Sequence, residues 1–223
     1  MTLEEIRKTY VTSDFHFSHF NIIKYTGRPW QTCLEMNEAI VKNMLESVPD
    51  GSILINLGDV SMFRFTKMKR MRKIRKWIMA HKGNRQLWLR TGNHDVGMEC
   101  ALRMKWHKNK FKTVDEAWHW MGFDKVFTED IALPFDDKVV IMSHHPIRID
   151  DDTKNIFNIH GHTHEKPAAC ITPKNKKQYK NACFDWAANH YKAVKLTKIL
   201  SDFNIAWKNT SFHDTTNEKR HKD

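Results

Sequence analysis

Five short motifs hold most of the side chains in this sequence that could bind a metal ion or transfer a proton. Each contains His, Asp or Asn, and each directly follows a short apolar segment. The motifs are Asp14-Phe15-His16, Gly58-Asp59, Gly92-Asn93-His94-Asp95, Ser143-His144-His145-Pro146 and Gly161-His162-Thr163-His164. Imidazole, carboxylate and amide groups together bind hard and borderline divalent ions. One such motif is common in any protein, but five at equivalent positions predict a hydrolytic site with two metal ions.

The apolar segments before the motifs are typical of buried strands, because they are short and rich in Val, Ile and aromatic residues. We expect strands at 8–13, 52–57, 86–91, 138–143 and 155–160. A polar side chain just after a strand lies in a loop on a rigid support, and open α/β sheets bind their ligands at that edge. Glycines at three of these strand ends would let the backbone turn sharply or approach a ligand closely.

The order of the motifs along the chain resembles the calcineurin-like metallophosphoesterase family. The match runs from Asp14 to His164, and the strand pattern extends it over about residues 8–200. The resemblance implies an α/β fold in which two packed mixed β-sheets are flanked by helices, forming a four-layer sandwich. It also implies that phosphate esters are hydrolysed by a water molecule activated at a dinuclear metal centre.

The same resemblance implies seven metal ligands. They are Asp14, His16 and His164 for one ion, Asn93, His144 and His162 for the other, and Asp59 as the bridge between them. We expect two divalent ions, with Mn²⁺ as the first choice and Fe or Zn²⁺ as alternatives, because the ligand set mixes imidazole, carboxylate and amide oxygen. No cysteine belongs to the set, which argues against a structural zinc site.

Two further residues of the third motif are expected to take part in catalysis. His94 follows the ligand Asn93 and would donate a hydrogen bond to the phosphoryl oxygens or protonate the departing alkoxide. Asp95 would orient His94 through a hydrogen bond, and capping of the loop is the alternative role for this residue.

Three other polar residues lie close to the motifs. His19 and Arg28 are candidate substrate-binding residues, because both follow the first expected strand. For His19 the alternatives are a contact to a ligand side chain or the start of a helix, and for Arg28 the alternative is a surface turn. His145 is adjacent to the ligand His144. Neighbouring side chains on an extended chain point apart, so we expect His145 to contact a ligand rather than a metal ion.

The charge of the chain is strongly positive and unevenly distributed. The 223 residues carry a formal net charge of +11, and the segment 64–90 contains eleven Lys or Arg residues and no Asp or Glu. Apolar residues recur there at helical spacing, which predicts an amphipathic helix with a basic outer face. Further basic residues gather at 103–112 and 174–180. The basic face is either an ordinary solvated surface or an attraction site for a polyanion such as nucleic acid.

Composition and patterning predict one domain over 1–212, followed by a polar disordered tail at 213–223. We expect helices at 35–48, with Gly51 as its stop, and at 114–121, a hairpin formed by 132–134 and 139–142, a polar loop at 174–180, and a strand at 181–186. Residues 194–203 could form a helix or a strand. The four cysteines form no C-x-x-C pair, and no signal peptide or bilayer-spanning segment is recognisable, which favours free thiols, a cytoplasmic location and no membrane role.

The sequence therefore favours a metallophosphoesterase acting on nucleotides or nucleic acid. The first alternative is a phosphomonoesterase for a small metabolite that is not a nucleotide, because the same metal centre can serve both reactions. The second is a basic nucleic-acid-binding or scaffold protein without catalysis on the same fold. The second alternative leaves the filled ligand positions and His94 without a role.

Overall fold

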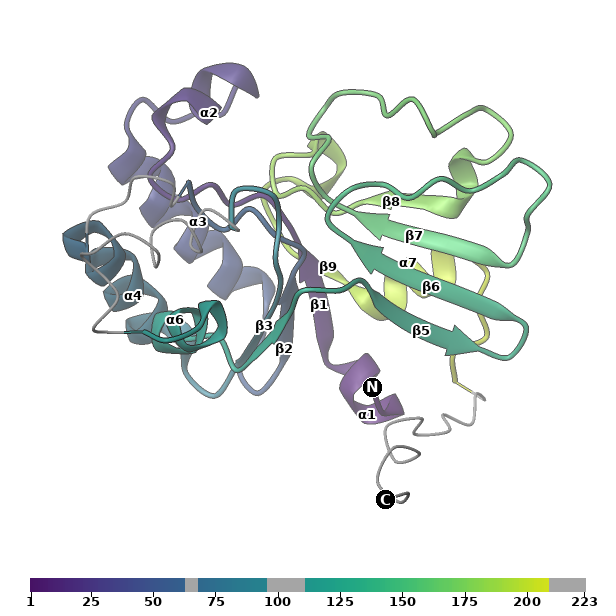
Figure 1. Cartoon of the computed structure of the whole chain (residues 1–223), viewed down its shortest axis with the longest axis horizontal. Coiled ribbons are helices and arrows are strands. Elements are labelled where there is room, and N and C mark those ends of the chain that lie inside the picture. Colours follow the sequence, from purple (N-terminus) through teal and green to yellow (C-terminus); the bar gives the residue numbers. More distant parts are fainter. Residues whose placement is uncertain (63–67, 96–110, 209–223) are drawn as a thin grey trace.

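The structure, a computed structural model, describes residues 1–62, 68–95 and 111–208 and contains two mixed β-sheets (Figure 1). The first sheet has the order β4-β3-β2-β1-β9, in which β1 to β4 are parallel and β9 is antiparallel to β1. Its strands are β1 (Thr9–Thr12), β2 (Ile53–Asn56), β3 (Gln86–Arg90), β4 (Lys125–Phe127) and β9 (Val194–Lys195). The three N-terminal strands form where the apolar segments predict them, with slightly shorter bounds.

The second sheet has four strands in the order β5-β6-β7-β8. They are β5 (Ile131–Phe135), β6 (Lys138–Ser143), β7 (Ile156–His160) and β8 (Tyr179–Asn181). β5 and β6 form the expected antiparallel hairpin, and Asp136 in its turn adopts a left-handed conformation with φ of 51°. β6, β7 and β8 are parallel, so the motifs that follow β6 and β7 lie at the same edge of the second sheet.

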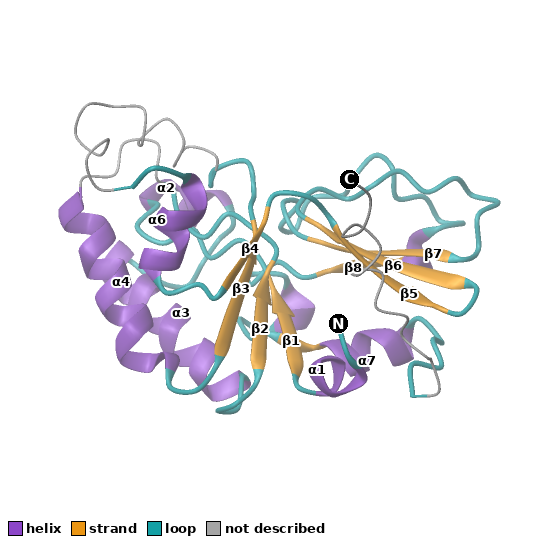
Figure 2. Ribbon diagram, turned by 60° about the horizontal axis from the view of Figure 1, so that its bottom comes forward, coloured by secondary structure: helices purple, strands orange, loops and turns teal. Residues whose placement is uncertain are grey.

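The two sheets share a hydrophobic core because side chains alternate between the faces of each strand. Val11, Ile55 and Trp88 of the first sheet pack in one cluster with Val140 and Ile159 of the second. Helices α1 (Leu3–Arg7) and α7 (Leu196–Asp202) contribute to the same cluster and lie on the side of the first sheet that faces the second (Figure 2). The burial of this cluster fixes the two sheets against each other.

Helices cover the other face of the first sheet. They are α2 (Phe20–Tyr25), α3 (Cys33–Ser47), α4 (Met68–Lys82) and α6 (Val114–Met121). The side-chain oxygens of Thr32 and Thr113 accept hydrogen bonds from the backbone N–H groups three residues later, which explains why α3 and α6 begin there. Gly122 ends α6 with φ of 115°.

The expectation of two mixed sheets with flanking helices is confirmed, but the four-layer sandwich is not. Within the described ranges, the outward-facing residues of β5 and β6, such as Pro134 and Ile141, are exposed or partly exposed, and the helices that pack into the cores lie against the first sheet or between the sheets. Figure 2 shows a helical layer, then the first sheet, then the second sheet, with α1 and α7 on the side of the first sheet that faces the second.

Several local expectations need correction. The helix expected at 35–48 forms as α3, which ends at Ser47. Pro49 rather than Gly51 stops it, because a proline ring disfavours a helical conformation in the residue before it. The expected strand at 181–186 starts earlier, as β8, and breaks after Asn181. The expected loop at 174–180 contains a 3-10 helix, η2 (Lys176–Gln178), and a second one, η3 (Ala187–Asn189), follows β8. The segment 194–203 forms both alternatives in succession, β9 and then α7.

Residues 68–82 of the basic segment 64–90 form α4, whose Met71, Ile74 and Ile78 are buried in the core as the periodicity predicts. The expected tail at 213–223 and nearly all of the basic segment 103–112 lie outside the described residues. Cys170 and Cys183 are free thiols. No helix in the described part of the chain is long and apolar enough to cross a membrane.

Candidate metal centre

The five motifs meet because each follows a strand whose carboxyl end lies at the same edge of its sheet. β1, β2 and β3 are parallel, as are β6 and β7, and the two edges face each other across the interface between the sheets (Figure 1). Hydrogen bonds join the loops: the N–H of Asp14 donates to Gly58 O at 2.9 Å, and His162 N–H donates to Asp14 Oδ2 at 2.8 Å. The side chains of all seven expected ligands therefore come from loops that brace one another.

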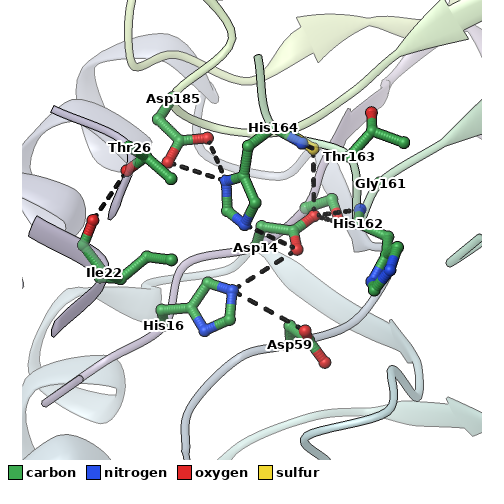
Figure 3. Close-up of polar contacts among 12 residues, drawn as sticks. Asp14, His16, Ile22, Thr26, Asp59, Gly161, His162, Thr163, His164 and Asp185 are labelled. Atoms are coloured by element: carbon green, nitrogen blue, oxygen red, sulfur yellow. Dashed lines mark hydrogen bonds and ion pairs between the residues drawn. The ribbon is translucent and has the colours of Figure 1, made fainter. Parts of the chain in front are cut away.

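Asp14, His16 and His164 form the first group of possible ligands. His16 Nε2 and His164 Nε2 each lie 3.6 Å from Asp14 Oδ1 (Figure 3). The other carboxylate oxygen of Asp14, Oδ2, accepts hydrogen bonds from the Ser13 hydroxyl, the His162 N–H and the Cys183 thiol. One oxygen thus holds the loops together, and the other faces the two imidazoles.

Asp59 lies between the first group and His144. Its Oδ2 is 3.7 Å from His16 Nε2 and 3.4 Å from His144 Nε2, and its Oδ1 accepts a hydrogen bond from the backbone N–H of His94 at 2.8 Å. Oδ2 also lies 3.9 Å from His94 Nε2. A single buried carboxylate oxygen therefore faces imidazole nitrogens that come from both sheets.

His144, Asn93 and His162 form the second group. His144 Nε2 lies 2.9 Å from Asn93 Oδ1, and the rings of His144 and His162 are 5.2 Å apart between centroids. His145 packs against His162 with 4.0 Å between centroids, and its ring nitrogens come close enough to those of His144 and His162 for the three to share an ion. The structure thus brings His145 beside His144 and His162. The expectation that it contacts a ligand rather than a metal ion stays a prediction.

Two atoms of the first group are buried without a hydrogen-bond partner among the described residues. They are Asp14 Oδ1 and His16 Nε2. Leaving a buried polar atom unpaired costs about 1–3 kcal/mol, so such atoms need a partner. Donor atoms that bind one ion at about 2.1 Å lie about 3.0–3.4 Å from one another. The spacings around Asp14 and Asp59 are 3.4 to 3.7 Å, at or just above the upper end of that range. Both observations fit a divalent cation as the missing partner.

Five of the seven expected ligands have a left-handed backbone, which residues other than glycine seldom adopt. The φ angles are 60° for Asp14, 52° for His16, 55° for Asp59, 66° for His162 and 49° for His164. Such conformations persist only where the surrounding structure enforces them, and they cluster at functional sites. The strain indicates that these side chains are held in positions that an unconstrained loop would not choose.

Hydrogen bonds fix which nitrogen of two imidazoles faces the centre. His144 Nδ1 lies 2.8 Å from the carbonyl oxygen of Leu57, and His164 Nδ1 lies 2.7 Å from Asp185 Oδ1. Because both partners are acceptors, each Nδ1 carries the proton and each Nε2 is directed toward the carboxylates. Metal-binding histidines are commonly held in this way by a carbonyl or a carboxylate.

The carboxylates alter the protonation of these histidines. Burial opposes the charged form of His144, but the contact with Asp59 and the charges of Asp14 and Asp59 raise its pKa to about 9. Burial also opposes the charged form of His164, yet Asp185 and Asp14 raise its pKa. Burial and the neighbouring His145 and His144 lower the pKa of His162 to about 4. A proton therefore occupies the buried part of the centre when no cation neutralises the carboxylates.

Asp185 and Arg28 form a support behind His164 that the sequence patterns do not predict. Arg28 is buried, donates to Asp185 and to the carbonyl oxygens of Phe15 and Asp14, and pairs with Asp185 at 2.9 Å. The expectation that Arg28 binds substrate is wrong, and so is the alternative of a surface turn, because the side chain of Arg28 is fully buried. Asp185 follows no recognisable motif, so no local signal identifies it.

Asp95 holds the loops instead of contacting the ring of His94. Its carboxylate accepts hydrogen bonds from the backbone N–H groups of Asp59, Val60 and Gly92 at 2.7, 3.0 and 2.9 Å. The described residues show no hydrogen bond between Asp95 and the imidazole of His94. The expectation that Asp95 orients His94 directly is therefore corrected to the capping alternative, since both oxygens of the carboxylate accept from backbone N–H groups of the loops.

His94 and His19 lie at the mouth of the centre. The side chain of His94 is 35% exposed, and the rings of His16 and His94 are 5.4 Å apart. His19 Nδ1 lies 3.3 Å from His16 Nδ1, and burial together with His16 lowers the pKa of His19 to about 4. His19 is also the residue before α2, so it combines a contact to a ligand side chain with the start of a helix.

An open cleft of about 940 Å³ gives access to these residues. It is lined by His16, His19, Asp59, His94, His145, His162 and His164 together with residues of α2 and the segment 163–170. None of the described residues that line it belongs to α4. A cleft of this size accommodates a ligand as large as a nucleotide.

The fold and the sequence of the chain are similar to those of known proteins. No protein-family model matches the chain. The structure is similar to the protein of unknown function AQ665 from Aquifex aeolicus, with 23% identity and a TM-score of 0.57 over 86% of this chain and 97% of that one. It also resembles the nuclease MPE from Pseudomonas putida, with 18% identity and a TM-score of 0.43 over 71% of this chain and 61% of that one.

One relative is closer in sequence. The uncharacterized protein MJ1445 of Methanocaldococcus jannaschii is 31% identical over 146 residues, which are 66% of this chain and 74% of that protein. Both its identity and its coverage are high enough to establish common membership of one family. The chain therefore belongs to the same protein family as MJ1445.

Proposed function

We propose that this protein is a metal-dependent phosphoesterase with a dinuclear centre that acts on nucleotides or nucleic acid. The observation that carries the proposal is the position of Asp59 Oδ2, which faces His16 Nε2 on one side and His144 Nε2 on the other. Two cations close together need a shared anion between them, and the carboxylate of Asp59 would supply it.

The proposed ligands are those that the sequence suggested. The first ion would be held by Asp14, His16 and His164, the second by Asn93, His144 and His162, with Asp59 shared and Mn²⁺, Fe or Zn²⁺ as the ions. Bound there, the ions would neutralise the charge of the phosphoryl group and lower the pKa of a water molecule. The two unpaired buried atoms, Asp14 Oδ1 and His16 Nε2, support this assignment.

The protein's own side chains would bind and orient the substrate. His94 is half-buried at the mouth of the cleft, so its imidazole could donate to a phosphoryl oxygen or protonate the leaving group. Asp95 would act indirectly, because it fixes the backbone of the loop that carries His94. The cleft and the net charge of +11 favour a nucleotide or polynucleotide as the substrate.

Two variants test the proposal. His94→Ala should retain its metal ions but lower kcat by roughly 10²–10⁴-fold, the usual contribution of a positioned acid or base. Asp59→Asn should lose the shared anion, hold at most one ion per chain and lose nearly all activity. The measurements are metal content by mass spectrometry and hydrolysis of a chromogenic phosphodiester and a chromogenic phosphomonoester with added Mn²⁺.

His81→Ala is the matched control, because His81 is an exposed histidine that lies outside the cleft. It should keep both the metal content and the activity of the unchanged protein. If the unchanged protein binds no more than one transition-metal ion per chain at full activity, the dinuclear proposal fails. If His94→Ala loses metal in proportion to activity, His94 is a ligand.

A further inference from the structure

A second hollow adjoins the metal cleft and has the chemistry of a nucleotide-binding pocket. Its volume is about 380 Å³, and it shares Thr163, Lys166, Pro167 and Ala168 with the lining of the cleft. These four residues follow β7, so the loop that carries the ligands His162 and His164 forms a rim between the two hollows. Figure 3 shows Thr163 on this loop beside His164.

Three lysines give the second hollow a positive charge. Lys166, Lys176 and Lys180 line it, and none of its described lining residues is acidic. Within the described residues, none of the three ammonium groups forms an ion pair with a carboxylate, whereas Lys82 and Lys198, for example, do. Unneutralised lysines in a concave surface attract phosphate groups.

Two aromatic side chains complete the hollow. Tyr179 is fixed because its hydroxyl donates to the carbonyl oxygen of Ile147 at 2.9 Å and accepts from the N–H of Ile149 at 3.1 Å. Trp186 is only partly buried and has no described aromatic ring in contact with its indole. A partly exposed indole beside lysines is the combination on which a base of single-stranded nucleic acid stacks while its phosphates are neutralised.

We propose that this second hollow binds a nucleotide next to the phosphate held in the metal cleft, so that the substrate is a single-stranded polynucleotide. The proposal rests on the proposed function of the cleft, because it takes the metal centre as the place of hydrolysis. A mononucleotide or a small metabolite would fill the cleft alone and leave the lysines and Trp186 unused.

Binding without turnover tests the second hollow separately from the chemistry. The probe is a fluorescein-labelled oligothymidylate of about 12 nucleotides, a length within the range that single-strand-binding folds cover. Fluorescence anisotropy is measured with protein stripped of metal by a chelator, at salt concentrations from about 50 to 200 mM. Hydrolysis of a chromogenic phosphodiester by the unchanged protein with Mn²⁺ is measured in parallel, so that failure of the proposed function and failure of this inference give different results.

Replacing Lys166, Lys176 and Lys180 together with Gln should weaken binding of the probe by at least about tenfold at low salt. It should also reduce the slope of the logarithm of the binding constant against the logarithm of the salt concentration by about 2. Trp186→Ala should weaken binding by about tenfold, and Trp186→Phe should restore most of the affinity, because a ring is enough for stacking. In the charge-matched control, Lys42, Lys195 and Lys198 are together replaced by Gln. These lysines line neither hollow, so the control should bind the probe with an affinity within about twofold of the unchanged protein.

Three results would overturn the inference. The first is an equal loss of affinity in the control triple variant, which would mean that net charge alone attracts the probe. The second is unchanged affinity in both the pocket triple variant and Trp186→Ala when circular dichroism shows that they are folded. The third is displacement of the probe by a polyglutamate peptide of matched charge as effectively as by unlabelled oligothymidylate, which would indicate an acidic protein as the partner.

Discussion

At the scale of single residues, the buried pair of Arg28 and Asp185 is the support on which the first group of ligands depends. Asp185 accepts from His164 Nδ1 and pairs with Arg28, while Arg28 also donates to the carbonyl oxygens of Phe15 and Asp14. One guanidinium thus connects both the carboxylate behind His164 and the loop of Asp14. The pair orients ligands without touching a metal or a substrate.

Asp185→Asn should lower metal affinity by about 10–100-fold, the usual effect of losing a group that holds a metal-binding histidine. It also leaves Arg28 buried without an anionic partner, which should reduce the free energy of unfolding by about 3–5 kcal/mol. Metal titration of the folded variant and urea unfolding measure the two effects. Asp150→Asn is the control, because its partner Arg148 and Asp150 itself are 87% and 80% exposed. If folded Asp185→Asn binds metal with unchanged affinity, Asp185 does not support metal binding by His164.

The protonation of His144 makes metal binding depend on pH. Its pKa is raised to about 9, so the imidazole carries a proton at neutral pH, but only the neutral form can bind a metal ion. Metal affinity should therefore rise with pH by about tenfold per unit for each proton released, until the pH passes the pKa of His144. Titration calorimetry in two buffers of different ionisation enthalpy should show release of at least one proton per chain near neutral pH. Release of none would contradict the assignment of His144 as a ligand.

At the scale of secondary-structure elements, the ends of the strands position the centre through backbone contacts that tolerate no side chain. A Cβ on Gly92, just after β3, would lie 2.5 Å from the backbone nitrogen of Asp59 and would also collide with its carboxylate. A Cβ on Gly58, after β2, would come within 2.6 Å of both the nitrogen and the Cα of Gly92. The loops after β2 and β3 can therefore meet only because both positions are glycine.

Gly92→Ala should displace Asp59 and abolish stoichiometric metal binding, while the far-ultraviolet circular dichroism stays that of a folded α/β protein. The matched control is Gly51→Ala, where a Cβ would meet no atom within 4 Å but φ is 75°. The control should lose about 1–2 kcal/mol of stability from the left-handed backbone and keep its metal ions. If both variants bind metal normally, the close approach at Gly92 has no bearing on the centre.

At the scale of the whole molecule, the basic helix α4 and the metal cleft lie in different places. Lys69, Arg72, Lys73 and Lys76 are exposed, but α4 packs against α3 and α6 and contributes no described residue to the lining of the cleft. Figures 1 and 2 show α4 on the outer side of the helical layer. Any contribution of this helix to polynucleotide binding must therefore come from charge at a distance from the cleft or from a long ligand.

Replacing Lys69, Arg72, Lys73 and Lys76 with Gln should weaken the binding of long single-stranded polynucleotide, and it should reduce the dependence on salt, because fewer counterions are released. Binding of an oligonucleotide of about 12 residues and turnover of a small chromogenic ester should stay unchanged. Anisotropy with probes of two lengths and a colorimetric assay check these outcomes. No change with either probe would leave α4 as an ordinary solvated helix.

The sequence by itself determined which residues end the strands and in what order the ligand types follow. Asp14, Asp59 and His144 could be selected because a polar ligand directly after an apolar strand is a local pattern, and the parallel order of the strands then brings such ends together. The amphipathic periodicity of α4 and the hairpin of β5 and β6 were equally local. These features depend on neighbours in the chain, so pattern and propensity were enough to predict them.

The tertiary structure decided what depends on distant residues. Asp185 lies 21 positions from His164, and Arg28 lies 157 positions from Asp185, so no spacing rule connects them. The capping role of Asp95 and the left-handed backbone of Asp14, His16, Asp59, His162 and His164 also arise from contacts between loops of different strands. A short sequence pattern records which side chains are present. The backbone conformation and the hydrogen-bond partner of each are set by the packing of the two sheets, which only the folded chain defines.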